Sequence, residues 1–153
     1  MTIFDELHAG VTTTSSEETR ALAARLAAEL PPDATLALHG DLGVGKTTFV
    51  QGLAHGFGVA APVTSPTFNI LHLYRSRPAL HSLGEEGRIL VHLDAYRLEN
   101  AHQVSELMLE DFLVSPYCLA VEWPEKIAAA LPADAWHLSL GIEAPGRHRV
   151  GLT

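Results

Sequence analysis

One glycine-rich segment with a lysine is the part of the sequence best suited to chemistry. Residues 40–47 read GDLGVGKT and fit the Walker A pattern G-x-x-x-x-G-K-[ST]. Glycines let the backbone curl so that successive N–H groups point at phosphate oxygens, and the following helix adds its positive end. The Lys46 ammonium is placed to reach terminal phosphates, and the Thr47 hydroxyl is placed to bind Mg²⁺. The segment therefore predicts binding of a nucleoside triphosphate with Mg²⁺.

Two carboxylates stand at the ends of apolar segments that are typical of buried strands. Asp94 follows RILVHL, and Glu122 follows YCLAV. In open α/β sheets ligands bind at the carboxyl ends of strands, so we expect both acids to reach the phosphate site. Such a site needs acids to hold Mg²⁺ and to orient a nucleophile. The spacing does not say which acid does which, and the alternative is that both are surface acids at strand ends.

Four further positions have a chemical and a structural interpretation. Thr64 and Ser65, in a loop after the helix that begins near Lys46, either contact the γ-phosphate or form an ordinary Ser-Pro turn. His92 lies two residues before Asp94; the nine histidines show no metal-ligand spacing, which favours a core role over a metal pair. Trp123 directly follows Glu122 and either covers the site or caps the core.

Alternating strand and helix patterns predict the elements that position these residues. We expect an α/β protein of the P-loop NTPase type, a sandwich whose mixed, mostly parallel central sheet is flanked by helices in one domain over residues 1–153. Antiparallel pairing is expected around residues 68–94 and between the last two strands. The expected strands are 2–8, 34–40, 68–74, 88–94, 117–122, 136–142 and 148–153, and the expected helices begin near residues 15, 46, 103 and 124.

Composition narrows the classes of function. The chain has 153 residues, of which 47% are hydrophobic and 18% charged, as in globular proteins. Its net charge of −8 argues against a surface that binds nucleic acid backbones unaided. Residues 91–130 hold seven acids against two basic residues, which indicates a solvated or partner-facing surface. A single cysteine, no membrane-length apolar run and no signal-peptide pattern predict a cytoplasmic protein without a membrane role.

Several motifs occur together in one order along nearly the whole chain. They are HGDLGVGKTTFVQGL (39–53), VTSPTFNI (63–70), HLDAYRL (92–98), ELMLEDFL (106–113) and VEWPEKI (121–127). The Walker A motif alone is generic, whereas SPTF, then H-x-D-x-Y-R, then E-W-P-E is specific. With these motifs the chain resembles the TsaE family (also called YjeE), the ATPase component of bacterial tRNA threonylcarbamoyladenosine synthesis. The connection over residues 75–88 is longer than we expect for that family.

The resemblance implies a weak ATPase that uses ATP and Mg²⁺. It also implies partnership with the TsaD–TsaB pair, which transfers a threonylcarbamoyl group to a tRNA adenosine, so that tRNA is reached only through partners. By resemblance Lys46, Asp94 and Glu122 are catalytic, Asp94 lying near the γ-phosphate. The resemblance further assigns Gly43, Val44, Gly45, Lys46, Thr47 and Thr48 to the phosphate loop, Thr47 and Glu122 to Mg²⁺, and Ser16 and Gly146-Arg147 to the nucleotide base.

Two other functions remain as alternatives. In a small-molecule P-loop kinase Asp94 would be the base for an acceptor hydroxyl, and the arginines of residues 75–88 would form a lid. In a nucleotide-gated binding module hydrolysis would have no use. The absence of an N-K-x-D motif counts against a small GTPase.

Overall fold

The computed structural model describes residues 1–64, 70–76 and 87–153 of the chain. Its centre is one seven-stranded sheet with the order β1-β7-β6-β2-β5-β4-β3. The strands are β1 (Val11–Thr13), β2 (Ala34–His39), β3 (Leu71–Arg75), β4 (Ile89–Asp94), β5 (Tyr117–Glu122), β6 (Trp136–Ala144) and β7 (Arg147–Leu152). The helices are α1 (Ile3–Ala9), α2 (Ser16–Glu29), α3 (Lys46–Gly56), α4 (Ala101–Glu106) and two 3-10 helices, η1 (Leu109–Asp111) and η2 (Pro124–Ala130).

Strand pairing is parallel in the middle of the sheet and antiparallel toward both of its edges. Strand β2 pairs in parallel with β5 and β6, and β4 pairs in parallel with β5. The pairs β3–β4, β6–β7 and β1–β7 are antiparallel. This arrangement confirms the predicted α/β fold with a mixed sheet, and the parallel pairing lies in the centre of that sheet. Because Asp94 is aligned with Glu122, and Glu122 with Leu38, strands β4, β5 and β2 end at one edge.

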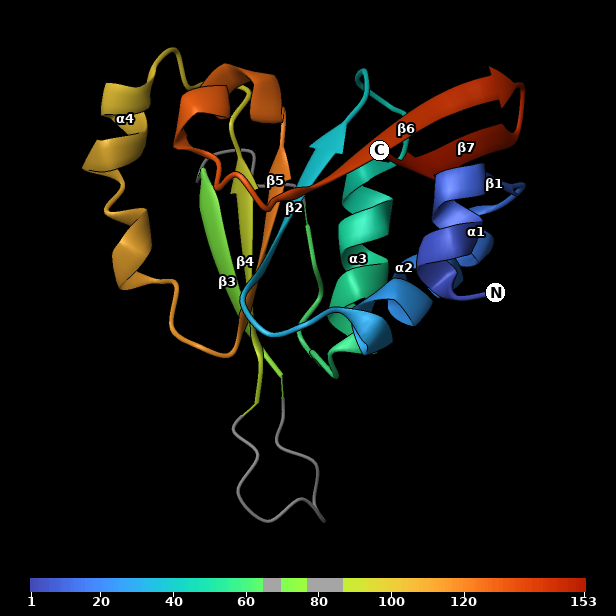
Figure 1. Ribbon diagram of the computed structural model, residues 1–153, viewed down its shortest axis with the longest axis horizontal. Helices are drawn as coiled ribbons and strands as arrows, with labels where there is room; N and C mark the ends of the chain where they lie inside the picture. Colours follow the sequence, from blue (N-terminus) through green and yellow to red (C-terminus); the bar gives the residue numbers. More distant parts are fainter. Residues whose placement is uncertain (65–69, 77–86) are drawn as a thin grey trace.

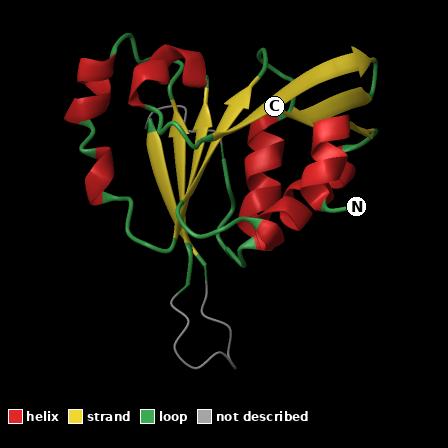
Figure 2. Cartoon of the chain, in the orientation of Figure 1, coloured by secondary structure: helices red, strands yellow, loops and turns green. Residues whose placement is uncertain are grey.

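Helices cover both faces of the sheet, and each face has its own hydrophobic core (Figures 1 and 2). Helices α1, α2 and α3 cover one face, where Leu26, Phe49 and Leu53 pack on Leu36 and Leu138. The segment from α4 to η2 covers the other face, where Val104 and Ile127 pack on strands β4 and β5. The alternation of side chains along a strand explains this division, since successive residues point to opposite faces.

The N-terminal segment differs from its prediction. Residues 2–8 were expected to form a strand, but they form helix α1. Thr2 and Asp5 make a capping box, in which the Thr2 hydroxyl accepts from the Asp5 amide at 3.1 Å and the Asp5 carboxylate accepts from the Thr2 amide at 2.9 Å. Ile3 and Leu7, one helical turn apart, are buried on the first core. The short strand β1, which was not predicted, follows directly.

Two helical predictions are also modified. The helix expected to begin near residue 103 breaks at Met108, whose φ of 51° lies in the left-handed region, into α4 and η1. The segment after Glu122 is a 3-10 helix in the structure. The expected strand over 68–74 appears as β3 from Leu71, and its first two residues lie outside the described residues, as does most of the 75–88 connection.

Helices α2 and α3 approach each other closely through two glycines. A Cβ placed on Gly52 would lie 2.4 Å from the Arg20 carbonyl oxygen, and one on Gly56 would lie 2.8 Å from that of Ala24. Only glycine fits at these contacts. The start of α2 is fixed by Ser15, whose side chain accepts from the Glu18 amide at 3.1 Å. Among the described helices, none is long and apolar enough to cross a bilayer.

Candidate functional site

The loop between β2 and α3 has the backbone shape that its glycines predict. Gly43 and Gly45 have φ angles of 82° and 102°, which side-chain-bearing residues rarely adopt. A Cβ at either glycine would meet no atom of the described residues within 4 Å. No side chain from the described part of the chain caps the N-terminus of α3, which begins at Lys46. Its first N–H groups therefore remain available to an anion, the condition that phosphate binding at a helix N-terminus requires.

Lys46 is buried between the loop and an aromatic ring. Its side chain donates a hydrogen bond from Nζ to the Gly40 carbonyl at 2.5 Å, and Nζ lies 3.6 Å from the centroid of the Trp123 ring. Burial lowers the pKa of Lys46, while the negative charges of Glu122, Glu125 and Asp94 act in the opposite direction. The ammonium is thus desolvated and surrounded by acids, a setting in which its charge acts strongly on a bound phosphate.

Glu122 meets the start of α3 from the end of β5. Its Oε2 lies 3.4 Å from the Thr47 hydroxyl, which donates to it, and 2.5 Å from Nε2 of His92. Only 4% of the Glu122 surface is exposed, so the carboxylate is held by these contacts. The two residues predicted to bind Mg²⁺ therefore lie side by side. Mg²⁺ takes oxygen ligands and commonly uses one or two protein groups together with waters and substrate phosphates, so a hydroxyl and a carboxylate fit it.

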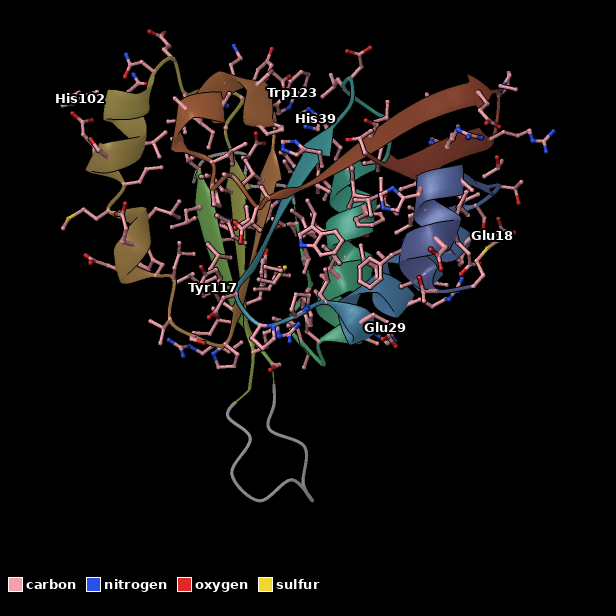
Figure 3. The ribbon with its side chains drawn as sticks, in the orientation of Figure 1. Glu18, Glu29, His39, His102, Tyr117 and Trp123 are labelled. Carbon is pink, nitrogen blue, oxygen red and sulfur yellow. The ribbon has the colours of Figure 1, made fainter. Side chains whose placement is uncertain are left out.

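Asp94 lies on the same edge of the sheet, beside Glu122. The two residues are paired across β4 and β5, and the Ala95 amide donates to the Glu122 carbonyl at 3.0 Å. The Asp94 side chain accepts from the Tyr96 amide at 3.0 Å and is half-buried. Figure 3 labels Trp123 at the end of the sheet where these strands terminate, and Tyr117, the first residue of β5, at the opposite end.

A separate pocket of about 250 Å³ adjoins the phosphate loop. Four predicted residues line it, namely Ser16, Gly45, Thr48 and Gly146. Thr14, Ser15, Thr19 and His148 complete the lining. The pocket thus joins the phosphate loop to the start of α2 and to the turn between β6 and β7. Arg147, which was predicted together with Gly146, is exposed and does not line the pocket.

His148 is a site residue that sequence reasoning missed. Its Nδ1 donates to the carbonyl of Val44 at 3.0 Å and ties the phosphate loop to β7. Val44 is itself buried, at 6% exposure. No motif or local spacing marks His148, because its role depends on a strand that returns to the loop from more than 100 residues away. The contact forms only once β7 lies beside the phosphate loop.

The remaining predicted residues differ in where the structure places them. Thr64 is exposed, and Ser65 lies outside the described residues. Cys118 is completely buried, and burial raises the pKa of its thiol to about 12. His92 is also completely buried, as a core role requires, but it contacts Glu122. Trp123 covers Lys46 and also packs against the second core, so both interpretations of this residue apply.

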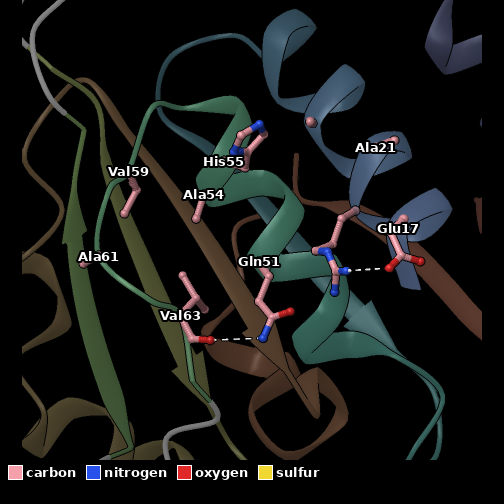
Figure 4. A pocket seen from close by; sticks show the side chains of 10 residues that line it. Glu17, Ala21, Gln51, Ala54, His55, Val59, Ala61 and Val63 are labelled. Atoms are coloured by element: carbon pink, nitrogen blue, oxygen red, sulfur yellow. Dashed lines mark hydrogen bonds and ion pairs between the residues drawn. The ribbon is translucent and has the colours of Figure 1, made fainter. Parts of the chain in front are cut away.

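Two other cavities lie near the loop or beside α3. One of about 610 Å³ is lined by His39, Asp41, Trp123 and Glu125 together with the exposed side chains of Leu42 and Ile142. The other, of about 660 Å³, lies between α2, α3 and residues 59–63 (Figure 4). Gln51 donates to the Val63 carbonyl at 3.1 Å in its wall. Of the predicted site residues that the structure describes, none lines this second cavity.

Comparisons with curated proteins find relatives that share one name. Two curated relatives, both named tRNA threonylcarbamoyladenosine biosynthesis protein TsaE, come from Bacillus subtilis and from Nostoc sp.. The first is 37% identical over 123 residues, which are 80% of this chain and 70% of that protein. The second is 39% identical over 115 residues, which are 72% of this chain and 65% of that protein. This chain therefore spans about two thirds of the length of each.

A solved structure and a family model point the same way. The crystal structure of Bacillus subtilis YdiB matches with a TM-score of 0.72 and 30% identity, covering 94% of this chain and 82% of that one. The model of the family described as "Threonylcarbamoyl adenosine biosynthesis protein TsaE" matches residues 13–149. That range contains the phosphate loop, both strand-end acids and every residue that lines the smaller pocket. The chain belongs to the TsaE family, whose members take part in tRNA threonylcarbamoyladenosine biosynthesis.

Proposed function

We propose that this protein is a Mg²⁺-dependent ATPase that acts with a TsaD–TsaB pair in the formation of threonylcarbamoyladenosine in tRNA. The observation that carries the proposal is the meeting of Lys46, Thr47 and Glu122 where a phosphate loop begins a helix. Asp94 lies at the same sheet edge. A P-loop with a neighbouring acid pair is the arrangement that phosphoryl-transfer enzymes use.

Each residue has a distinct part in the proposed reaction. The amides from Gly43 to Thr48 hold the phosphates, and Lys46 moves from the Gly40 carbonyl to the β and γ oxygens. Thr47 and Glu122 hold Mg²⁺, which, when bound, neutralises negative charge on the phosphates. Asp94 orients the attacking water. Ser16 and Gly146, which both line the smaller pocket, border the base.

Charge supports a role for partners in reaching tRNA. The chain has 18 acidic residues against ten lysines and arginines, which gives its net charge of −8, and Lys46 in the phosphate loop is one of only two lysines. Contact with an RNA backbone depends on several exposed cations. We therefore propose that the partner proteins bind tRNA, as the resemblance to the family implies. This protein binds phosphate groups of the nucleotide through its own loop. In this proposal the protein works in the cytoplasm, and it has no membrane role.

The test is ATP hydrolysis by the Lys46→Ala variant, with and without a TsaD–TsaB pair. Loss of the ammonium removes the main positive side chain of the site, so we expect turnover to fall by about 10²-fold or more. The matched control is Lys126→Ala, which removes the only other lysine, an exposed one. Near-normal hydrolysis in Lys46→Ala would contradict the proposal.

The same assays separate the two alternatives. Capture of the protein by an immobilised TsaD–TsaB pair, compared with ATP, with ADP and without nucleotide, is expected to depend on the nucleotide. ATP consumption that rises with a small-molecule acceptor and not with these partners would instead indicate a kinase. Full function over many cycles with a slowly hydrolysed ATP analogue would indicate a binding module without useful hydrolysis.

A further inference from the structure

His92 is a buried polar residue with one polar contact. No part of it is exposed, and its Nε2 lies 2.5 Å from Oε2 of Glu122. Its other ring nitrogen, Nδ1, is buried and has no hydrogen-bond partner among the described residues. An unpaired buried nitrogen costs free energy that an aliphatic side chain of similar size would not. A histidine at this position is therefore explained by its contact with Glu122 and not by packing alone.

The sheet brings the two side chains together diagonally. His92 on β4 is paired with Ala120 on β5, and Glu122 follows two residues later on the same face of β5. Ala120 has only a methyl group and is fully buried, so the imidazole ring has room to lean toward the carboxylate. The 2.5 Å distance from Nε2 of His92 to Oε2 of Glu122 shows that the ring reaches the carboxylate across this diagonal offset. The contact is thus built into the strand register.

The direction of the hydrogen bond follows from its acceptor. A carboxylate has no proton to give, so Nε2 carries the hydrogen and donates it to Glu122. The Thr47 hydroxyl donates to the same oxygen, at 3.4 Å. No hydrogen bond reaches Oε1 of Glu122 from any residue that the structure describes. His92 therefore occupies a lone pair of Oε2, fixes the rotation of the carboxylate, and leaves Oε1 for another ligand.

We propose that His92 is a positioning residue for Mg²⁺, which acts by fixing the Glu122 carboxylate. This inference rests on the proposed function, because it takes Glu122 as a metal ligand. Mg²⁺ demands near-ideal octahedral geometry and has few protein ligands in sites of this kind, so the angle of a single carboxylate matters. Groups that hold a ligand in place in this way typically change metal affinity by about 10- to 100-fold when they are removed.

The experiment measures binding of a fluorescent ADP analogue, with no turnover involved, over a series of Mg²⁺ concentrations. In His92→Leu, which keeps the volume and loses the donor, we expect the Mg²⁺ concentration for half-maximal tightening to rise by about 10- to 100-fold. Affinity for the analogue without Mg²⁺ is expected to stay as in the unaltered protein. His92→Gln, whose amide can reach the Nε2 position, is expected to restore most of the Mg²⁺ response, and His92→Asn, which is shorter, is not.

Glu122→Gln separates this inference from the proposal beneath it. We expect Glu122→Gln to lose the Mg²⁺ response, and an unchanged response in that variant would overturn the proposed metal ligand itself. If Glu122→Gln loses the response while His92→Leu keeps it, the role of His92 is overturned and the proposed function stands. Thermal melts without nucleotide check that each variant folds. If His92→Leu does not fold, the comparison of His92→Gln with His92→Asn decides the question. Equal Mg²⁺ responses in these two variants would overturn the inference.

Discussion

The Lys46 ammonium lies 3.6 Å from the centroid of the Trp123 ring while it donates a hydrogen bond to the Gly40 carbonyl. Trp123 holds this place with a φ of 56°, a left-handed conformation that is strained for a bulky residue. Tyr96 supports the ring from a centroid distance of 5.1 Å. Lys46 therefore has a defined position between a backbone carbonyl and an aromatic face.

This contact predicts measurable coupling between the two side chains. In a double-mutant cycle with Lys46→Met and Trp123→Leu, we expect a favourable coupling of about 0.5–2 kcal/mol in the free energy of unfolding. Urea denaturation without nucleotide measures it. The matched control pair is Lys126 and Tyr96, 5.8 Å apart and exposed, for which a smaller coupling is expected. Equal coupling in the two pairs would show that Trp123 does not hold Lys46.

Asp94 is expected to act on hydrolysis more than on binding. The Asp94→Asn variant keeps an oxygen that can accept from the Tyr96 amide, so the local turn is preserved while the charge is removed. We expect kcat to fall by about 10²- to 10⁴-fold, the range for loss of a group that orients or activates a nucleophile. Nucleotide affinity, measured by calorimetry, is expected to change little. A matched loss of affinity and turnover would make Asp94 a structural residue.

The smaller pocket predicts a steric effect at the start of α2. Ser16→Phe fills part of a cavity of about 250 Å³, so affinity for an adenine nucleotide is expected to fall about tenfold, equivalent to about 1.4 kcal/mol. The control is Glu17→Phe, one residue further along, which does not line this pocket. A fluorescent ADP analogue reports both affinities. Equal effects of the two substitutions would place the base elsewhere.

The acidic segment of residues 91–130 predicts that reversing a charge on its surface weakens capture by the partner proteins. Glu110 is exposed next to Met108, which is 58% exposed on the same 3-10 turn. If this surface docks a basic partner patch, Glu110→Lys is expected to weaken capture by TsaD–TsaB several-fold at low salt and less at high salt. Nucleotide affinity is expected to stay unchanged. Glu29→Lys, an equal charge change at the C-terminus of α2, is the control, and equal loss in both variants would indicate only a net-charge effect.

The parts of the site that depend on short sequence patterns could be predicted from the sequence alone. The Walker A loop and the strand-end positions of Asp94 and Glu122 follow from short patterns, and parallel pairing then places both acids at one edge. The wrong strand over residues 2–8 shows how two local signals compete. Apolar residues in that segment suggested a strand, but a capping box at Thr2 and the one-turn spacing of Ile3 and Leu7 produce a helix.

The rest of the site could not be predicted because it depends on long-range pairing. Strand β1 pairs with β7, with Thr13 opposite His148, and this brings the start of α2 beside the β6–β7 turn. The contact of His148 with Val44 depends on the same return of the chain. His92 was correctly expected to be buried, but its partner was not, because the diagonal contact with Glu122 appears only when the register of β4 and β5 is known.

The glycine contacts between α2 and α3 have a consequence for the smaller pocket. Helix α2 supplies Ser16 to this pocket, and α3 supplies Thr48. Gly52 and Gly56 set how near these helices can lie, because even a methyl group at either position would meet the backbone of α2. The width of the pocket therefore depends on two positions that do not line it.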